Sequence, residues 1–137
     1  MNLPPLRATD RNDATDNQAM LMFITKRLYY EVRVTILRGA TGRSPILEYI
    51  ESLAKPERAR VLEGLEQVER RGLDAVRVQF RQIEGKLWEV KIGSHRVFYV
   101  IIGKEEMVLL HAYKKQGQKL PVKERDIAIR RMKELLS

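Results

Sequence analysis

Hydrophobic and polar residues alternate with a period of two in five segments of the chain. The first segment, "YYEVRVTIL" (29–37), is rich in β-branched residues and is followed by a glycine-containing turn. The other four segments follow one another at 76–83, 86–92, 96–102 and 106–113. Because this alternation is typical of strands with one buried face, the pattern predicts five β-strands.

Between the first two strands, and again after the last, apolar residues recur at helical spacing. Ser44-Pro45 predicts an N-cap followed by proline at the first helical position. Lys55-Pro56 separates this first helix from a second, which ends at Gly72, and a third helix follows Pro121. Their apolar faces are formed by Ile46, Leu47, Ile50 and Leu53, by Val61, Leu62, Leu65 and Val68, and by Ile127, Ala128, Met132, Leu135 and Leu136.

Short connections join the last four strands, at Glu84-Gly85, Gly93-Ser94-His95 and Gly103-Lys104-Glu105. Connections of this length are typical of hairpins, so these strands are predicted to form an antiparallel meander. The order β-α-α-β-β-β-β-α indicates a single α+β domain over residues 29–137. Residues 1–28 begin with a Pro-, Asp- and Asn-rich stretch of little periodicity, and we expect a disordered leader there.

Composition narrows the possible functions. The chain has no cysteine and only two histidines, which excludes disulfides and thiolate chemistry and argues against a histidine metal site. Its formal charge of +8 and pI near 9.9 favour an anionic partner such as nucleic acid. No run approaches the roughly 20 apolar residues of a membrane span, so we expect a cytoplasmic protein without a membrane partner.

The positive charge is concentrated on the predicted meander. Residues 77–119 carry nine Lys and Arg against four Asp and Glu, a net charge of +5. A basic sheet of this kind can bind the backbone of RNA. The same argument makes "LLHAYKKQGQKLP" (109–121), where the last strand passes into a basic loop, a candidate RNA contact.

Alternation also predicts which side chains share a face of the sheet. On the strand 86–92, Trp88, Val90 and Ile92 are predicted to face the core, with Leu87, Glu89 and Lys91 opposite. On the last strand, Met107, Leu109, His111 and Tyr113 are predicted to share one face. Arg96 opens the strand between them, so these mixed faces can converge in one shallow cleft.

Each candidate residue also has an ordinary structural interpretation. Glu89 and Lys91 are equally consistent with exposed positions on the open side of a sheet. His111, after two leucines, fits a hydrogen-bonded and partly buried histidine. The lysines of the basic loop fit a solvated surface.

The candidate residues could together cleave RNA without a metal ion. A base removes the proton of a 2′-hydroxyl, cations stabilise the phosphorane that forms, and an acid protonates the leaving 5′-oxygen. Lys, Arg, His and Tyr can fill these roles. The sequence shows no cluster of acids suited to hold Mg²⁺, which argues against a two-metal nuclease and against a metal cofactor.

Four segments carry a resemblance to a known family: "SPILEYIESL", "GKLWEVKI", "HRVFYVI" and "LLHAYKKQGQKLP", the last followed by a basic helix. In order and spacing, from Tyr30 to Leu136, they resemble the phage-derived, HigB-like branch of the RelE/HigB toxins of type II toxin–antitoxin systems. This resemblance implies a helical hairpin and a C-terminal helix packed on a twisted antiparallel sheet. It also implies an endoribonuclease that cleaves mRNA in the ribosomal A site, and a cognate helix-turn-helix, HigA-like antitoxin.

The resemblance further implies site residues. RelE-like toxins often carry two alternating basic residues on the strand matching "LWEVKI", where this chain has Glu89 and Lys91. Arg96 matches their phosphate-binding arginine, and Lys115 or Lys114 matches their basic residue after the last strand. No tyrosine follows Tyr113, so Tyr113 or His111 takes the place of their C-terminal tyrosine.

The resulting prediction separates two groups of residues. The catalytic group is Lys91, Arg96, Lys115, His111 and Tyr113, and the RNA-binding group is Lys86, Glu89, Lys114 and Lys119. Two alternatives remain for a protein of this fold. One is a gyrase-inhibiting toxin of the ParE kind, and the other is a basic RNA-binding module without catalytic activity.

Overall fold

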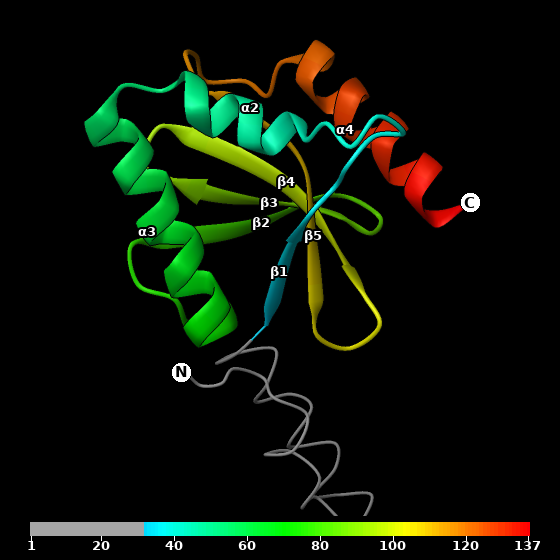
Figure 1. The fold of residues 1–137 in the computed structure, drawn as a ribbon, viewed down its shortest axis with the longest axis horizontal. Helices are drawn as coiled ribbons and strands as arrows, with labels where there is room; N and C mark the ends of the chain where they lie inside the picture. Colours follow the sequence, from blue (N-terminus) through cyan, green and yellow to red (C-terminus); the bar gives the residue numbers. More distant parts are fainter. Residues whose placement is uncertain (1–31) are drawn as a thin grey trace, which may run out of the picture.

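Caps and turns divide residues 32–137, which the computed structural model describes, into five strands and three α-helices (Figure 1). The expected leader at 1–28 and the start of the expected strand at 29–37 lie outside the described residues. The α+β class is confirmed. In chain order the elements are β1 (Arg33–Ile36), α2 (Pro45–Ser52), α3 (Lys55–Arg71), a 3₁₀ turn (Gly72–Asp74), β2 (Val78–Glu84), β3 (Leu87–Ile92), β4 (His95–Ile102), β5 (Glu106–Lys114) and α4 (Val122–Leu136).

Local sequence explains where the two helices of the hairpin begin and end. The Ser44 hydroxyl accepts a hydrogen bond from the Leu47 amide at 3.2 Å, and Pro45 follows in the first turn of α2. Pro56 lies in the first turn of α3, where no amide hydrogen is needed. Gly72 ends α3 with φ 57°, a conformation that glycine adopts without steric cost.

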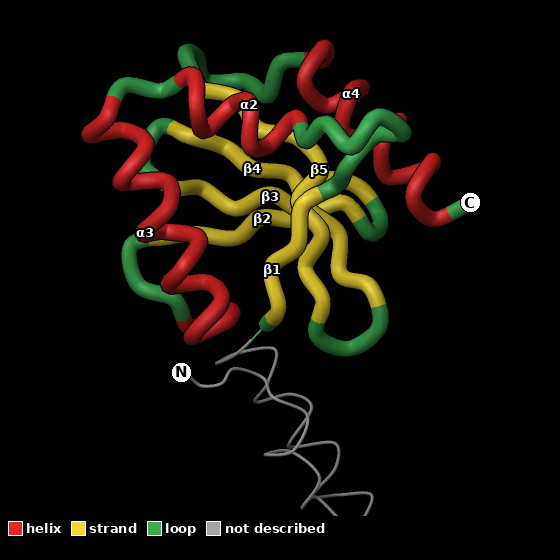
Figure 2. The backbone as a smooth tube through the Cα atoms, in the orientation of Figure 1, coloured by secondary structure: helices red, strands yellow, loops and turns green. Residues whose placement is uncertain are grey.

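The strands form one sheet in the order β1-β5-β4-β3-β2 (Figure 2). The predicted antiparallel meander of β2 to β5 is confirmed. The resemblance implies an antiparallel sheet, and the sheet is mixed, because β1 pairs with β5 in parallel. Between β1 and β2 the chain passes through α2 and α3 from one edge of the sheet to the other. No tight turn therefore sets the direction of β1 relative to its neighbour.

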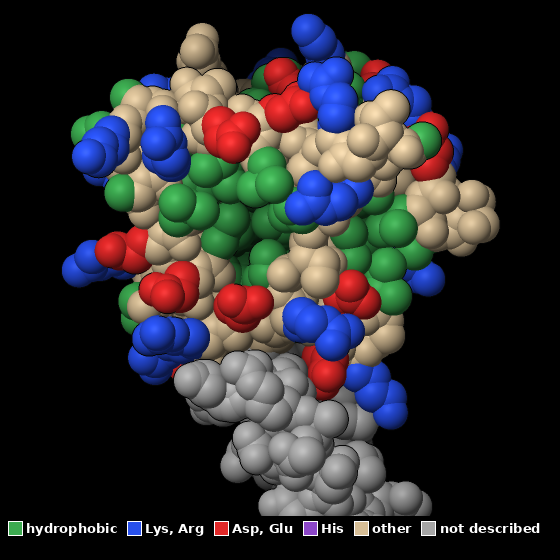
Figure 3. All heavy atoms as spheres, in the orientation of Figure 1, with side chains coloured by type: hydrophobic (Ala, Val, Ile, Leu, Met, Phe, Trp, Pro, Cys, Tyr) green, Lys and Arg blue, Asp and Glu red, His purple; other side chains and the backbone are tan. Residues whose placement is uncertain are grey.

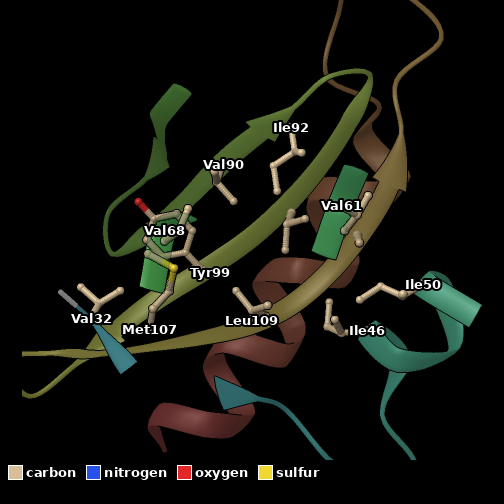
Figure 4. Close-up of a cluster of buried hydrophobic side chains, with 12 residues drawn as sticks. Val32, Ile46, Ile50, Val61, Val68, Val90, Ile92, Tyr99, Met107 and Leu109 are labelled. Carbon is tan, nitrogen blue, oxygen red and sulfur yellow. The ribbon is translucent and has the colours of Figure 1, made fainter. Parts of the chain in front are cut away.

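Helices α2 and α3 cover one face of the sheet. Side chains of both helices pack there against alternate residues of β3, β4 and β5, as Figure 4 shows for Ile46, Val61, Val90 and Leu109. At Gly64 the helix α3 comes so close to β3 that an added Cβ would lie 2.6 Å from Ile92 Cγ2. Between α3, α2 and β1 the surface is hollowed and lined by hydrophobic side chains, with charged side chains around it (Figure 3).

Helix α4 covers the opposite face. Ala128 of α4 is fully buried against a second cluster, in which Leu87, Phe98, Leu110 and Tyr113 take part. Since α4 and the helical hairpin lie on opposite faces, strands β3, β4 and β5 are covered on both sides. Glu89 and His95, two polar residues of these strands, are therefore fully buried, Glu89 even though alternation alone makes it look exposed.

Candidate functional site

Three of the predicted catalytic residues lie side by side across β3, β4 and β5. Lys91 is the direct cross-strand partner of Arg96, and Arg96 is the partner of Tyr113. Gln79 of β2 extends this row on the other side of Lys91. Directly opposed residues of antiparallel strands have Cβ atoms about 4.5–5.5 Å apart. The three side chains are therefore close enough to act on one bound group.

A second row lies two residues along each strand, on the same face. It consists of Arg81, Glu89, Phe98 and His111, paired in that order across β2, β3, β4 and β5. The rings of Phe98 and His111 are stacked at 6.1 Å with an interplanar angle of 7°. Phe98 also stacks on Tyr113, at 5.7 Å, and thereby connects the two rows.

A bulge in β5 determines the register of both rows. Phe98 pairs with His111, but the preceding pair of the ladder joins Tyr99 to Leu109. Leu110 is the extra residue between the two pairs. An extra residue in one strand reverses the alternation of the side chains beyond it.

The bulge overturns one prediction. His111 and Tyr113 do not share a face with Met107 and Leu109, because the latter two pack beneath α2 and α3 whereas Tyr113 packs beneath α4. If the pairing of β4 with β5 continued without a bulge from the three-residue turn at 103–105, Ala112 would stand opposite Arg96. The bulge places Tyr113 there instead.

A second irregularity, in β2, brings an unpredicted residue into the site. The register shifts between Gln82 and Glu84, so that Arg81 rather than Gln82 stands opposite Glu89. Arg81 is half-buried, and its Nη2 lies 3.1 Å from Glu89 Oε1. The turn predicted at Glu84-Gly85 places Phe80 opposite Glu89, which explains why Arg81 was missed.

Glu89 is fully buried, with 0% of its surface exposed, so the interpretation of Glu89 as an exposed surface residue is wrong. Arg81 forms an ion pair with it, but the approach misses hydrogen-bond geometry. Among residues 32–137 neither oxygen of Glu89 has a hydrogen-bond partner. Since buried carboxylates are normally hydrogen-bonded or fully paired, Glu89 is an unusual group in this fold.

Among the described residues, the buried side-chain polar atoms that lack a hydrogen-bond partner are concentrated around Glu89. Besides its two oxygens they are Arg81 Nε, Arg96 Nε and the Tyr113 hydroxyl. Burial raises the pKa of Tyr113 to about 12, and the charge of Glu89 adds to this while Arg96 and Arg81 oppose it. Tyr113 is therefore a neutral proton donor at pH 7. Four side chains from four strands thus hold unused hydrogen-bonding capacity in one place.

The Arg96 guanidinium is held at the turn between β3 and β4. Its Nη1 donates to the Gly93 carbonyl at 2.7 Å and to the His95 carbonyl at 3.1 Å. These bonds fix the side chain but neutralise none of its charge. Arg96 is therefore a preorganised cation within the first row, between Lys91 and Tyr113.

His111 has no free ring nitrogen in this structure. Its Nε2 lies 2.6 Å from Glu124 Oε1, and Arg131 Nη1 lies 3.1 Å from its Nδ1. A carboxylate only accepts and a guanidinium only donates, so this geometry requires the neutral imidazole. Burial lowers the pKa of His111, and Arg131 and Arg130 add to this while the bond to Glu124 opposes it. These contacts fix α4 to β5, and a proton-transfer role stays a prediction.

His95, which was not among the predicted site residues, is another fully buried titratable side chain of the meander. It points to the face that α2 and α3 cover, where its Nδ1 lies 2.7 Å from the Tyr49 hydroxyl and its Nε2 2.6 Å from Glu57 Oε1. The hydrogen bond from His95 lowers the pKa of Glu57. Both nitrogens are satisfied, so His95 connects the hairpin of helices to the turn that carries Arg96.

The predicted lysines outside the first row are dispersed. Lys115 is half-buried just after β5, where its amide donates to the Ser94 carbonyl at 2.8 Å. Lys114 stands opposite His95 on the face that α2 and α3 cover, and its charge helps lower the pKa of Glu57. Lys119 is exposed in the loop before α4, and Lys86 is exposed at the end of β3 away from Lys91. Their RNA contacts stay predictions.

The fold and this site define a basic α+β domain with a polar cluster on a covered sheet face. Comparison with known families identifies it further. A family model described as "Phage derived protein Gp49-like (DUF891)" matches residues 48–133, and the chain belongs to this family. It is a RelE/HigB-like toxin family, which indicates a toxin of a toxin–antitoxin system with an antitoxin partner. No curated protein matches the chain.

Two further features concern the described residues alone. No helix within residues 32–137 is long and apolar enough to cross a lipid bilayer. The same part of the chain has no group of three or more His, Cys, Asp or Glu side chains placed to hold a metal ion.

Proposed function

We propose that this protein is the toxin of a type II toxin–antitoxin system of the HigB-like branch and that it cleaves mRNA through attack of a 2′-hydroxyl. The observation that carries the proposal is the buried, incompletely bonded Glu89 beside Arg81, Arg96 and Tyr113. A fold gains no stability from unpaired buried polar atoms, since each costs about 1–3 kcal/mol. A bound substrate would supply the missing partners.

In this proposal Glu89 is the general base, which takes the proton of the 2′-hydroxyl. Arg96 and Lys91 bind the phosphate and stabilise the charge that develops on the phosphorane. Tyr113, which is protonated at neutral pH and whose pKa burial raises further to about 12, donates the proton that the leaving 5′-oxygen takes up. Lys115, just beyond the end of β5, is a further cation for the same phosphate.

Access to Glu89 requires a local rearrangement. The Arg81 side chain that pairs with it is 40% exposed, whereas Glu89 itself is 0% exposed. An incoming phosphate offers Arg81 a second anionic partner, so Arg81 can turn outward as RNA binds. This movement uncovers the base only when substrate is present.

The remaining parts of the proposal follow the resemblance to RelE/HigB toxins. They are cleavage in the ribosomal A site, a cytoplasmic location and inhibition by a helix-turn-helix antitoxin. The family supports the antitoxin partner in general terms. The net charge of +8 supports an RNA substrate.

Expression in a bacterial cell without the antitoxin tests the proposal. The wild-type chain should arrest growth and produce new 5′ ends within translated mRNA, and Arg96→Ala should abolish both while its thermal unfolding stays cooperative. Arg70→Ala is the matched control, because it removes an exposed arginine whose Nη2 lies 3.7 Å from Glu66 on α3, away from the rows. Full toxicity of Arg96→Ala contradicts the site, DNA damage with intact transcripts indicates a ParE-like gyrase inhibitor, and the absence of growth arrest indicates an inactive binding module.

A further inference from the structure

A shallow cavity opens beside the first row, where β2 begins and β3 turns into β4. It has a volume of about 470 Å³ and is lined by Arg77, Val78, Gln79, Lys91, Gly93 and Arg96. Three of these residues are cations, one is an amide and none is an acid. A concave site with this lining is suited to a small anionic group.

Within residues 32–137 the three cations have no acidic partner to balance them. None of the ion pairs among the described residues includes Arg77, Lys91 or Arg96. Arg96 bonds only to backbone carbonyls through Nη1, and its Nε is buried without a partner. Like charges held together in one cavity repel each other, and a bound anion removes that repulsion.

Arg77 reaches the cavity from a strained backbone position. Its φ is 64°, and it is the one residue other than glycine with a positive φ among residues 32–137. A long side chain rarely adopts this conformation, which suits glycine or asparagine better. Strain of this kind is concentrated at functional sites, where the surrounding structure maintains it.

Arg77 also borders a second cavity, of about 750 Å³, between α3 and the start of β2. The two cavities share Arg77 and Gly93, and the polar residues that the second adds to the lining are Arg60, Glu63 and Gln67. At the other end, Lys91 and Arg96 belong both to the first cavity and to the row that ends at Tyr113. A strand bound at Tyr113 can therefore continue past Arg77 toward α3.

We propose that Arg77 and Gln79, at the end of this cavity away from Tyr113, bind a backbone phosphate of single-stranded RNA next to the cleaved phosphate that Lys91 and Arg96 bind, with Arg77 as its dedicated ligand. This inference rests on the proposed function for the identity of the strand. Arg77 makes no contribution to the cleavage step itself. Its role is to hold the adjoining nucleotide, which places the reacting one over Glu89.

Binding of an uncleavable strand tests the inference. The probe is a short, fluorescently labelled single-stranded oligonucleotide of mixed sequence with 2′-O-methyl riboses, which lack the attacking hydroxyl. Arg77→Gly should weaken its binding about tenfold, the effect of losing one charge-assisted contact. The slope of log affinity against log salt should become shallower by about 0.7, which corresponds to one phosphate of a single strand.

The backbone strain supplies a second readout. Arg77→Gly relieves the positive φ, so its melting temperature should equal or exceed that of the wild-type chain while its RNA affinity falls. Arg77→Asn, which also tolerates this conformation, should behave in the same way, and Arg77→Lys should retain most of the affinity. Lys104→Gln is the matched control, since it removes one positive charge in the turn between β4 and β5, at the other end of β4.

Three results would overturn the inference. The first is a folded Arg77→Gly with the affinity and salt slope of the wild-type chain, the second is an equal loss of affinity in Lys104→Gln, and the third is a wild-type chain that does not bind the probe. The proposed function fails separately. Arg77-dependent binding without any cleavage of mRNA leaves the phosphate site standing and removes the nuclease.

Discussion

His95 and Glu89 are both fully buried in the same meander, but they lie on opposite faces of it and differ in their bonding. On the face covered by α2 and α3, His95 makes hydrogen bonds of 2.7 and 2.6 Å to Tyr49 and Glu57. On the face covered by α4, Glu89 has one ion pair with Arg81 and, among residues 32–137, no hydrogen bond to either oxygen.

The difference in bonding between His95 and Glu89 distinguishes a structural residue from a proposed functional one. A buried polar group with all its partners stabilises the arrangement it bonds, and His95 thereby fixes the turn whose carbonyls hold Arg96. A buried charge without its partners stabilises little and can cost stability. Under the proposed function the two faces of one sheet therefore have different tasks: one anchors the turn, and the other binds the RNA.

The largest expected effect is on catalysis by Glu89. Glu89→Gln keeps the shape of the side chain but removes the base, so mRNA cleavage should fall by roughly 10²–10⁴-fold. Glu89→Gln also removes the ion pair with Arg81, but the Arg81 side chain is 40% exposed and can turn to solvent, so the free energy of unfolding should change by no more than about 1 kcal/mol. Timed transcript mapping and urea unfolding measure the two effects. Undiminished cleavage would remove Glu89 from the mechanism.

The reverse pattern is expected for His95. His95→Ala empties a buried site and breaks two hydrogen bonds, so the free energy of unfolding should fall by about 2–4 kcal/mol. Tyr49→Phe, which removes only the bond to Nδ1, should cost about 1 kcal/mol. Urea unfolding of both variants checks this. A neutral His95→Ala would mean that the two faces do not differ as described.

A smaller effect, seen in the pH dependence of stability, tests the contacts of His111. Because burial lowers its pKa from 6.5, the native chain binds fewer protons than the unfolded chain as the pH falls below that value. The free energy of unfolding should therefore be highest above pH 6.5 and decline below it, by at most about 1.4 kcal/mol per pH unit.

His111→Asn should flatten this part of the pH profile. The carboxyl of Glu57, whose pKa is lowered from 4.5, adds a further loss of stability only at more acidic pH, so the two windows are separable. Urea unfolding between about pH 5 and 7.5 covers the first window. An identical slope in the wild-type chain and His111→Asn would show that His111 is not held in its neutral form.

Periodicity and caps were sufficient to predict most of the fold. Local sequence determines the start of α2 at Ser44-Pro45, the end of α3 at Gly72 and the hairpin meander. Each of these predictions was confirmed. The parallel pairing of β1 with β5 was not predictable in this way, since it joins Arg33 to Glu106, far apart in the chain. Only the packing of the whole domain determines that pairing.

Local sequence was also insufficient to predict the candidate site in full. Alternation on β3 correctly placed Glu89 and Lys91 on one face, but it could not show that α4 buries that face. The bulge at Leu110 turns Tyr113 toward Arg96, and the shift before Glu84 brings in Arg81. Neither irregularity is marked by a glycine or proline in its strand, so uninterrupted alternation was the natural but wrong expectation for both.

The chemistry of the cleaved ends tests the central claim most directly. Attack by a 2′-hydroxyl, with Glu89 as base, leaves a 5′-hydroxyl on the downstream fragment and a 2′,3′-cyclic phosphate or its 3′-phosphate product on the upstream one. Downstream fragments from cells expressing the wild-type chain should therefore accept a 5′ adapter only after treatment with polynucleotide kinase. Fragments that ligate without kinase carry 5′-phosphates and would contradict this mechanism.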